Sequence, residues 1–175
     1  MNEYDAVVYD LDGTLVELEV DWGTVATDVR SVYESAGVEP PGGDLWELLD
    51  RASDAGLDGE VESTVARYER EGARSAPRLA RADELLERSV PVGVCSLNCE
   101  RACRIALEEH DLAAAVDAVV GRDTVATRKP HPEPLLEAVD RLDASPAETL
   151  FVGDSPSDEV TADRAGTAFE YVRRE

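Results

Sequence analysis

Residues 4–14 read YDAVVYDLDGT, and this stretch decides the fold. Its first part, 4–10, is a short and largely apolar run, typical of a strand that is buried on both faces of a parallel sheet. Asp10, Asp12 and Gly13 follow at the end of the run. The sequence therefore predicts a buried strand that delivers two carboxylates to its carboxyl end, beside a glycine that permits a sharp turn.

Four more short apolar runs lie downstream, at 90–95, 116–120, 149–152 and 167–172. Helical patterns separate them, with stripes at a spacing of three and four residues. Strands that alternate with helices indicate right-handed βαβ units. We expect an α/β fold, in which a Rossmann-like parallel sheet of about five strands is flanked by helices.

Residues 16–75 break this alternation. Three helical stripes begin at Trp22, Leu45 and Val61, and glycine- or proline-rich segments separate them. An all-helical block inserted after the first strand would lie over the carboxyl edge of the sheet, where open α/β folds bind their ligands. The sequence predicts a catalytic core of residues 1–15 and 76–175, with a small helical cap formed by 16–75.

Charge is the strongest feature of the composition. Asp and Glu number 39 against 17 basic residues, which gives a net charge of -22. Nucleic acid and anionic membranes are excluded as partners, because both would be repelled. The acids are dispersed, and Lys129 is the only lysine. Such a surface is typical of a halophilic archaeon, in which a Debye length of about 3 Å at 1 M salt screens self-repulsion. We expect stability to require molar salt.

The remaining composition points to an ordinary cytoplasmic protein. No apolar run approaches the roughly 18 residues of a membrane span, and the first residues lack a basic signal-peptide region. Cys95, Cys99 and Cys103 are odd in number and form no C-x-x-C pair. Buried apolar side chains are favoured over a metal site or a disulfide. Monomer and homodimer both stay open, because Trp22 and Trp46 suit a core and a partner equally.

Two later strand ends carry groups suited to an anion. Ser96 follows the run 90–95, and Asn98 precedes a helix, so that a hydroxyl and backbone N–H groups could cradle phosphate. The alternative is that either side chain only caps the helix. Lys129 begins the segment KPHP, where a compact ammonium suits an anion. His131 is expected to face solvent, because carboxylates already fill the acid–base roles.

The last strand end carries Asp154 and Asp158, four residues apart, after the run 149–152. Hard oxygen ligands of this kind suit Mg²⁺, although Asp158 could equally cap the next helix. Gathering these acids in one crevice with Asp10 and Asp12 would raise their pKa values by mutual repulsion. The sequence therefore predicts that Mg²⁺, together with a lysine, offsets this repulsion.

The four motifs, in this order, resemble those of the haloacid dehalogenase-like (HAD) hydrolase superfamily, over residues 4–15 and about 90–172. The helical insert resembles the C1 type of cap, although it is short for that type. Residues 153–166 resemble the phosphoglycolate-phosphatase-like branch. In two places the chain departs from the family: Leu97 separates the serine from the asparagine, and Arg128 stands where glycine is frequent.

The resemblance implies a phosphatase mechanism. Asp10 would attack phosphorus and become an aspartyl phosphate. Asp12 would protonate the leaving alkoxide and then activate the hydrolytic water. The resemblance also implies that Mg²⁺ is bound by Asp10, by the backbone carbonyl of Asp12 and by Asp154. An acid at position 12 favours phosphoryl transfer over dehalogenation.

The resemblance assigns the other motif residues to phosphate binding. Ser96, Asn98 and Lys129 would hold the phosphoryl group, and Asp158 would position the lysine or support the metal. The expected partner is a small phosphorylated metabolite. Three alternatives stay open: a phosphomutase, a phospho-accepting receiver domain and a catalytically dead binding module. Receivers run near 120 residues without an insert, and their acceptor lies on a central strand rather than on the first.

Overall fold

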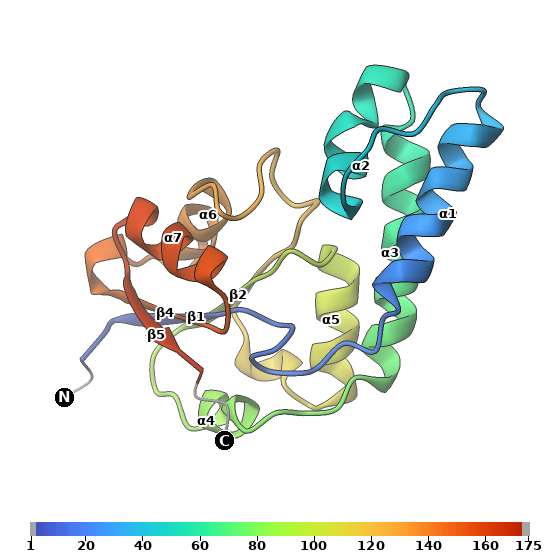
Figure 1. Ribbon diagram of the computed structural model, residues 1–175. Coiled ribbons are helices and arrows are strands. Elements are labelled where there is room, and N and C mark those ends of the chain that lie inside the picture. The colour runs from blue at the N-terminus through green and yellow to red at the C-terminus, as the bar shows by residue number, and fades with distance from the viewer. Residues whose placement is uncertain (1–2, 173–175) are drawn as a thin grey trace.

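The apolar runs form the strands of one parallel sheet in the computed structural model, which describes residues 3–172 (Figure 1). The strands are β1 (Ala6–Tyr9), β2 (Val92–Cys95), β3 (Ala118–Val120), β4 (Thr149–Gly153) and β5 (Ala168–Tyr171). All neighbours pair in parallel, in the order β3-β2-β1-β4-β5. The predicted α/β class and five-stranded sheet are confirmed.

The first strand is the central one. Val7 pairs with Val92 on one side and with Leu150 on the other. All four residues of β1 are buried, as expected for a strand covered on both faces. Because β1, β2 and β4 run side by side in parallel, their carboxyl ends reach the same edge of the sheet. The segments that carry Asp10, Ser96 and Asp154 begin there.

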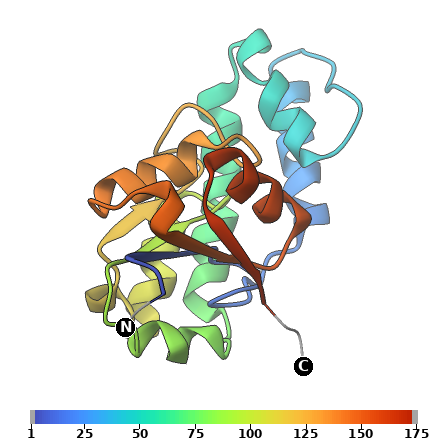
Figure 2. The same cartoon turned by 90° about the vertical axis from the view of Figure 1, so that its left-hand side faces the viewer.

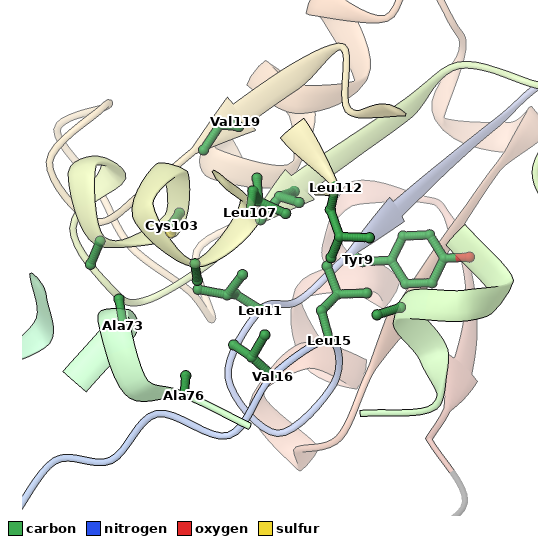
Figure 3. Close-up of a cluster of buried hydrophobic side chains, with 14 of the residues drawn as sticks. Tyr9, Leu11, Leu15, Val16, Ala73, Ala76, Cys103, Leu107, Leu112 and Val119 are labelled. Carbon is green, nitrogen blue, oxygen red and sulfur yellow. The ribbon is translucent and has the colours of Figure 1, made fainter. Parts of the chain in front are cut away.

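Alternate residues of β1 enter two different hydrophobic clusters. Val7 and Tyr9 pack with α5 (Glu100–Glu109) and α4 (Arg81–Leu86). Figure 3 shows this cluster, in which Tyr9 lies near Leu15 and Leu112. The second cluster contains Ala6 and Val8, packed against α6 (Glu133–Arg141) and α7 (Pro156–Ala165). Short 3-10 helices occupy Ser53–Ala55, Ala113–Ala115 and Pro146–Glu148.

The three cysteines belong to this core. Cys95, Cys99 and Cys103 are free and buried. Burial raises the pKa of Cys95 and of Cys99 to about 12, so that both remain neutral thiols. The interpretation of all three as buried apolar side chains is confirmed.

The segment after β1 contains three helices, as the sequence predicts: α1 (Trp22–Ser35), α2 (Leu45–Arg51) and α3 (Asp58–Ser75). They form a cluster of their own, with Val25, Leu48 and Val61 fully buried in it. Figure 2 shows α2 at the opposite end of the molecule from the start of β1 and the end of β5. The boundary between core and cap stays a prediction. Among residues 3–172, no helix combines the length and the apolarity needed to cross a membrane.

Helix α3 is shared between two clusters. Val61 and Val65, in its first half, pack against α1 and α2. Ala73, near its end, belongs to the cluster under the sheet, where Figure 3 shows it beside α5 and Cys103. The chain that enters the insert lies against the same end of the helix, because a Cβ added at Gly72 would lie 2.9 Å from the carbonyl oxygen of Glu19. One continuous helix therefore joins the insert to the sheet.

Candidate active site

The buried ammonium group of Lys129 connects the ends of β1 and β2 with the first turn of α7. The Lys129 Nζ donates hydrogen bonds to Asp10 Oδ1 at 3.0 Å, to Asp158 Oδ1 at 2.6 Å and to the Cys95 carbonyl at 3.1 Å. Its residue is 4% exposed, and the ring centroid of Phe151 lies 5.4 Å from the nitrogen. These three bonds use every proton of the ammonium group, so that the chain's only lysine is held in one position.

The charges around the Lys129 ammonium are unbalanced. Burial raises the pKa of Asp10 to about 7, because the positive charge of Lys129 offsets the lost hydration only in part and Asp158 adds repulsion. Burial alone would lower the pKa of Lys129, but Asp10 and Asp158 outweigh it and raise that pKa above its ordinary value. Two buried carboxylates thus share one cation. A further cation would stabilise the ionised form of both.

Asp154 completes a group of three carboxylates. One oxygen each from Asp10, Asp154 and Asp158 lies within 4.8 Å of the others. Asp158 is already engaged, since its other oxygen accepts the backbone N–H groups of Asp154 and Ser155 at 3.3 Å. The donor set is made of hard oxygens, is partly buried and carries excess negative charge, so it fits Mg²⁺. Asp10 and Asp154 are the residues best suited to bind the ion.

Gly13 makes this approach of Asp154 possible. Its φ of +81° lies in the left-handed region. A Cβ at this position would lie 2.2 Å from Asp154 Oδ2, closer than any side chain could tolerate. The turn after Asp12 therefore needs glycine for its conformation and also for the space that the Asp154 carboxylate occupies.

The Asp12 carboxylate is held apart from the group of three. Its Oδ1 accepts the backbone N–H of Leu18 at 2.8 Å. Burial raises the pKa of Asp12 to about 6, and the Leu18 hydrogen bond limits the rise. A carboxyl group with a pKa near neutrality can both donate and accept a proton. Its surroundings suit acid–base chemistry better than metal binding by the side chain.

Ser96 and Asn98 form a small hydrogen-bonded unit after β2. The Ser96 Oγ donates to Asn98 Oδ1 at 3.0 Å and accepts the Asn98 backbone N–H at 3.1 Å. Both residues are buried and line the same cavity as Asp10 and Lys129. Neither caps α5, which begins after Cys99. The capping interpretation is therefore wrong, while that of a site facing the cavity remains.

The sequence also predicted that backbone N–H groups at the start of α5 could bind phosphate, and this prediction is wrong for two of them. The N–H of Cys99 donates to Glu69 Oε2 at 3.0 Å, and that of Glu100 donates to Asp123 Oδ1 at 2.7 Å. Carboxylates of the protein thus occupy the positions that phosphate was expected to take. At the other helix, Asp158 and Ser155 form a capping box at the start of α7, so that Asp158 caps the helix and also binds Lys129.

A second buried ion cluster was not predicted from the sequence. The Arg122 guanidinium donates to Glu69 at 2.5 and 3.0 Å, to Glu62 at 2.7 and 3.1 Å, and to the Leu97 carbonyl at 2.8 Å. Glu69, on α3, is completely buried and also accepts the Asn98 side-chain amide at 3.4 Å. Burial lowers the pKa of Arg122, but the bonds to the two glutamates outweigh it and raise the pKa. The inserted helix thus contacts the Ser96–Asn98 unit.

A cavity of about 570 Å³ adjoins Asp10, Ser96, Lys129 and Asp154. Its lower side is formed by the motif residues already described. Its other side, which we call the insert wall, is formed by seven residues of the insert: Trp22, Gly23, Ala26, Arg30, Asp44, Leu45 and Trp46. Both tryptophans line this cavity, and neither belongs to a hydrophobic core cluster. Of the insert arginines, Arg30 lines the cavity, whereas Arg51 and Arg67 pair with nearby aspartates. His131 is exposed, as expected.

Comparison with known proteins agrees with this geometry. A family model described as haloacid dehalogenase-like hydrolase matches residues 7–172. The phosphoglycolate phosphatase of Rhodospirillum rubrum is 34% identical, over 92% of this chain and 76% of the relative. The pyrophosphatase PpaX of Bacillus cereus is 30% identical, over 93% of this chain and 80% of the relative.

Solved structures share the fold. CbbY from Rhodobacter sphaeroides, in complex with phosphate, superposes with a TM-score of 0.69 at 19% identity, covering 96% of this chain and 85% of that one. A HAD phosphatase from Thermococcus onnurineus gives 0.65 at 21% identity, covering 97% and 86%. The chain therefore belongs to the haloacid dehalogenase-like hydrolase family, and the curated relatives named here are phosphatases.

Proposed function

We propose that the protein hydrolyses a small phosphate monoester through an aspartyl phosphate formed on Asp10. One observation carries the proposal: Asp10, Lys129 and the pair Asp154 and Asp158, from three separate parts of the sequence, meet beside one cavity. A nucleophile needs a carboxylate oxygen that faces the cavity, and the phosphoryl group needs nearby positive charge. Asp10 and Lys129 offer these two properties.

The reaction takes two displacements. In the first, Asp10 forms a bond to phosphorus while the bond to the leaving oxygen breaks, and Asp12 gives that oxygen its proton. In the second, water attacks phosphorus, its proton passes to Asp12, and the bond to Asp10 breaks. The pKa of about 6 at Asp12 suits both transfers, since the proton it gives in the first step returns in the second.

The other groups bind and orient. The positive charge of Lys129 attracts the phosphoryl oxygens, Ser96 and Asn98 hold them, and Asp158 positions the Lys129 ammonium. We propose that Mg²⁺ is held by Asp10, Asp154 and the backbone carbonyl of Asp12. When bound, it supplies the positive charge that neutralises the phosphoryl oxygens.

The proposal extends to the organisation of the chain. Residues 1–15 and 76–175 serve as the catalytic core, and 16–75 serve as a cap of the C1 type that limits access to the cavity. The acidic surface, with a net charge of -22, supports a halophilic setting. The protein works as a monomer or a homodimer.

A phosphomutase is the nearest alternative, because the same two aspartates could return the phosphoryl group to a second hydroxyl. A receiver domain is less compatible with the structure. The position of the acceptor strand does not distinguish a receiver domain from a phosphatase here, since β1 is both the first strand in the sequence and the central strand of the sheet. The helical insert and the family do separate them, because the matched family is one of hydrolases.

Phosphate release from a panel of metabolite phosphates, with Mg²⁺ in high salt, tests the proposal. We expect turnover without a bisphosphate activator, which a mutase would need. Asp10→Asn should abolish turnover and keep the circular dichroism spectrum of the wild type. Asp5→Asn, an exposed aspartate before β1, is the matched control and should retain full activity. Wild-type rates in Asp10→Asn would mean that another residue is the nucleophile.

A further inference from the structure

The insert wall is mostly apolar on the side that faces the cavity. Trp22, Ala26 and Arg30 follow one another at intervals of four residues, so they form one stripe along α1. Leu45 and Trp46, in the first turn of α2, line the cavity beside them, and Gly23 and the N-cap residue Asp44 complete the wall. Trp22, Leu45 and Trp46 supply the large apolar side chains of the wall, although the cavity that they line also contains Asp10 and Lys129.

Both tryptophans of this 175-residue chain are found in the insert wall. Trp22 is 37% exposed, and Trp46 is half-buried. Trp46 is supported from outside the cavity by Arg128, whose guanidinium lies 5.1 Å from the ring centroid and pairs with Asp50 at 2.6 Å. An exposed aromatic face gains most when a ligand covers it, because it then leaves water.

The wall offers little to a second anionic group. Of the described cavity residues, Arg30 is the only cation that the insert contributes. Its guanidinium already donates to the Gly43 carbonyl at 3.2 Å, and it stands two turns of α1, about 12 Å, from Trp22. Asp44 adds a carboxylate to the same cavity. A leaving group with a carboxylate or another phosphate would meet indole rings and a like charge.

Size leads to the same conclusion. A cavity of about 570 Å³ lies within the usual range for whole small-molecule ligands, whereas a two-carbon phosphate ester would leave most of it filled with water. A phosphate ester with an aromatic ring would fill more of this space.

We infer that the substrate is a phosphate monoester of an alcohol that carries an aromatic ring, and that Trp22 and Trp46 bind the ring. This inference rests on the proposed function, because it takes Asp10 as the point of attack. The two tryptophans are specificity residues in this assignment. The cavity thus differs from one made for a small anionic leaving group.

A matched pair of alkyl esters tests the inference. 2-Phenylethyl phosphate and ethyl phosphate have leaving groups of similar basicity and differ in the ring, and 2-phosphoglycolate supplies an anionic leaving group. We expect kcat/KM for the ring-bearing ester to exceed that for both others by about tenfold or more. In Trp46→Ala or Trp22→Ala, the ratio of kcat/KM for 2-phenylethyl phosphate to kcat/KM for ethyl phosphate should fall to about one. In Trp46→Phe, most of the wild-type ratio should remain.

Controls separate this inference from the proposed function. Leu136→Ala removes an apolar side chain that is also 37% exposed, on α6 away from the cavity, and should leave the ratio unchanged. Binding is measured apart from turnover in Asp10→Asn, through the emission of the two cavity tryptophans. Tighter binding of the ring-bearing ester there would support the inference even if no ester were hydrolysed. Equal binding of all three esters, or preference for 2-phosphoglycolate, would overturn it.

Discussion

Arg122 and Glu69 form a buried ion pair, 2.5 Å long, that fastens the inserted helix α3 to the loop carrying Ser96 and Asn98. The side chains of the pair are 5% and 0% exposed, so water cannot replace either partner. The same guanidinium binds the carbonyl of Leu97, which lies between Ser96 and Asn98 in that loop. The geometry of that loop therefore depends on a residue of the insert.

Arg122→Met should be strongly destabilising, because it leaves the Glu69 carboxylate buried without a cation. We expect a loss of about 3–5 kcal/mol in the free energy of unfolding, measured with urea. Arg51→Met is the control, since its pair with Asp54 is 57% and 72% exposed and should contribute at most about 1 kcal/mol. Equal losses in both variants would contradict the importance of burial.

Adding Glu69→Leu to Arg122→Met should restore much of the stability, because two apolar side chains replace the ion pair. KM should be higher in the double variant than in the wild type, because the Asn98 amide and the Cys99 N–H have lost their carboxylate partner. A double variant with wild-type KM would show that the pair acts on stability alone.

Gly13→Ala and Gly37→Ala separate backbone strain from the loss of space for Asp154. The two glycines have similar φ values, +81° and +72°, so backbone strain should cost each variant about 1–2 kcal/mol in the free energy of unfolding. A Cβ at Gly37 meets nothing within 4 Å, whereas one at Gly13 collides with the Asp154 carboxylate. Adding Mg²⁺ should raise the Tm of Gly37→Ala by as much as it raises the Tm of the wild type, but it should raise the Tm of Gly13→Ala by less. An equal rise in both would argue against Asp154 as a ligand.

The Asp12 carboxyl group should make stability fall as pH rises. Its pKa is raised from 3.8 to about 6 in the folded protein, so between these values the folded state binds more protons than the unfolded state. The penalty is absent below pH 3.8 and complete above pH 6, where it reaches at most about 3 kcal/mol. Without Mg²⁺, Asp12→Asn should therefore be more stable than the wild type at pH 8, by a margin that vanishes near pH 4. A margin independent of pH would refute this assignment.

Salt should stabilise the protein by screening. With 39 acidic against 17 basic residues, self-repulsion opposes folding at low ionic strength. Raising KCl from 0.1 M to 1 M shortens the Debye length from about 10 Å to about 3 Å. We expect Tm, measured with a chelator present, to rise by about 5 °C or more. Choline chloride at the same ionic strength should act alike, since screening does not depend on the cation. A flat response would exclude a requirement for salt.

Much of the fold could be predicted from the sequence, because its pattern is local. Short apolar runs that end in Asp10, Ser96 and Asp154 predict both the strands and the edge at which they meet. The three helices of the insert follow from their stripes and from the breaks between them. Helix α4 was not predicted, because six residues are too few to establish a helical period.

The parts of the site that could not be predicted are formed by contacts across the chain. Arg122 resembles any loop arginine, and nothing near it in the sequence indicates that it is buried. Glu69 did leave a signal, because it lies four residues after Val65 and eight after Val61 on the apolar stripe of α3. A charged residue on such a stripe needs a buried partner. The position of the tryptophans depends on how α1 and α2 pack, which no local pattern specifies.

Because α3 is shared between two hydrophobic clusters, the insert can move only a little relative to the sheet. A rigid lid swings on flexible hinges, but here the connecting segment is an unbroken helix, packed at both ends and pinned at Glu69 in between. Wide opening would have to unwind that helix or strip a charge from its partner. We therefore expect substrate and product to enter and leave without a wide movement of the insert, so that substrates are selected by their fit to a cavity that already exists.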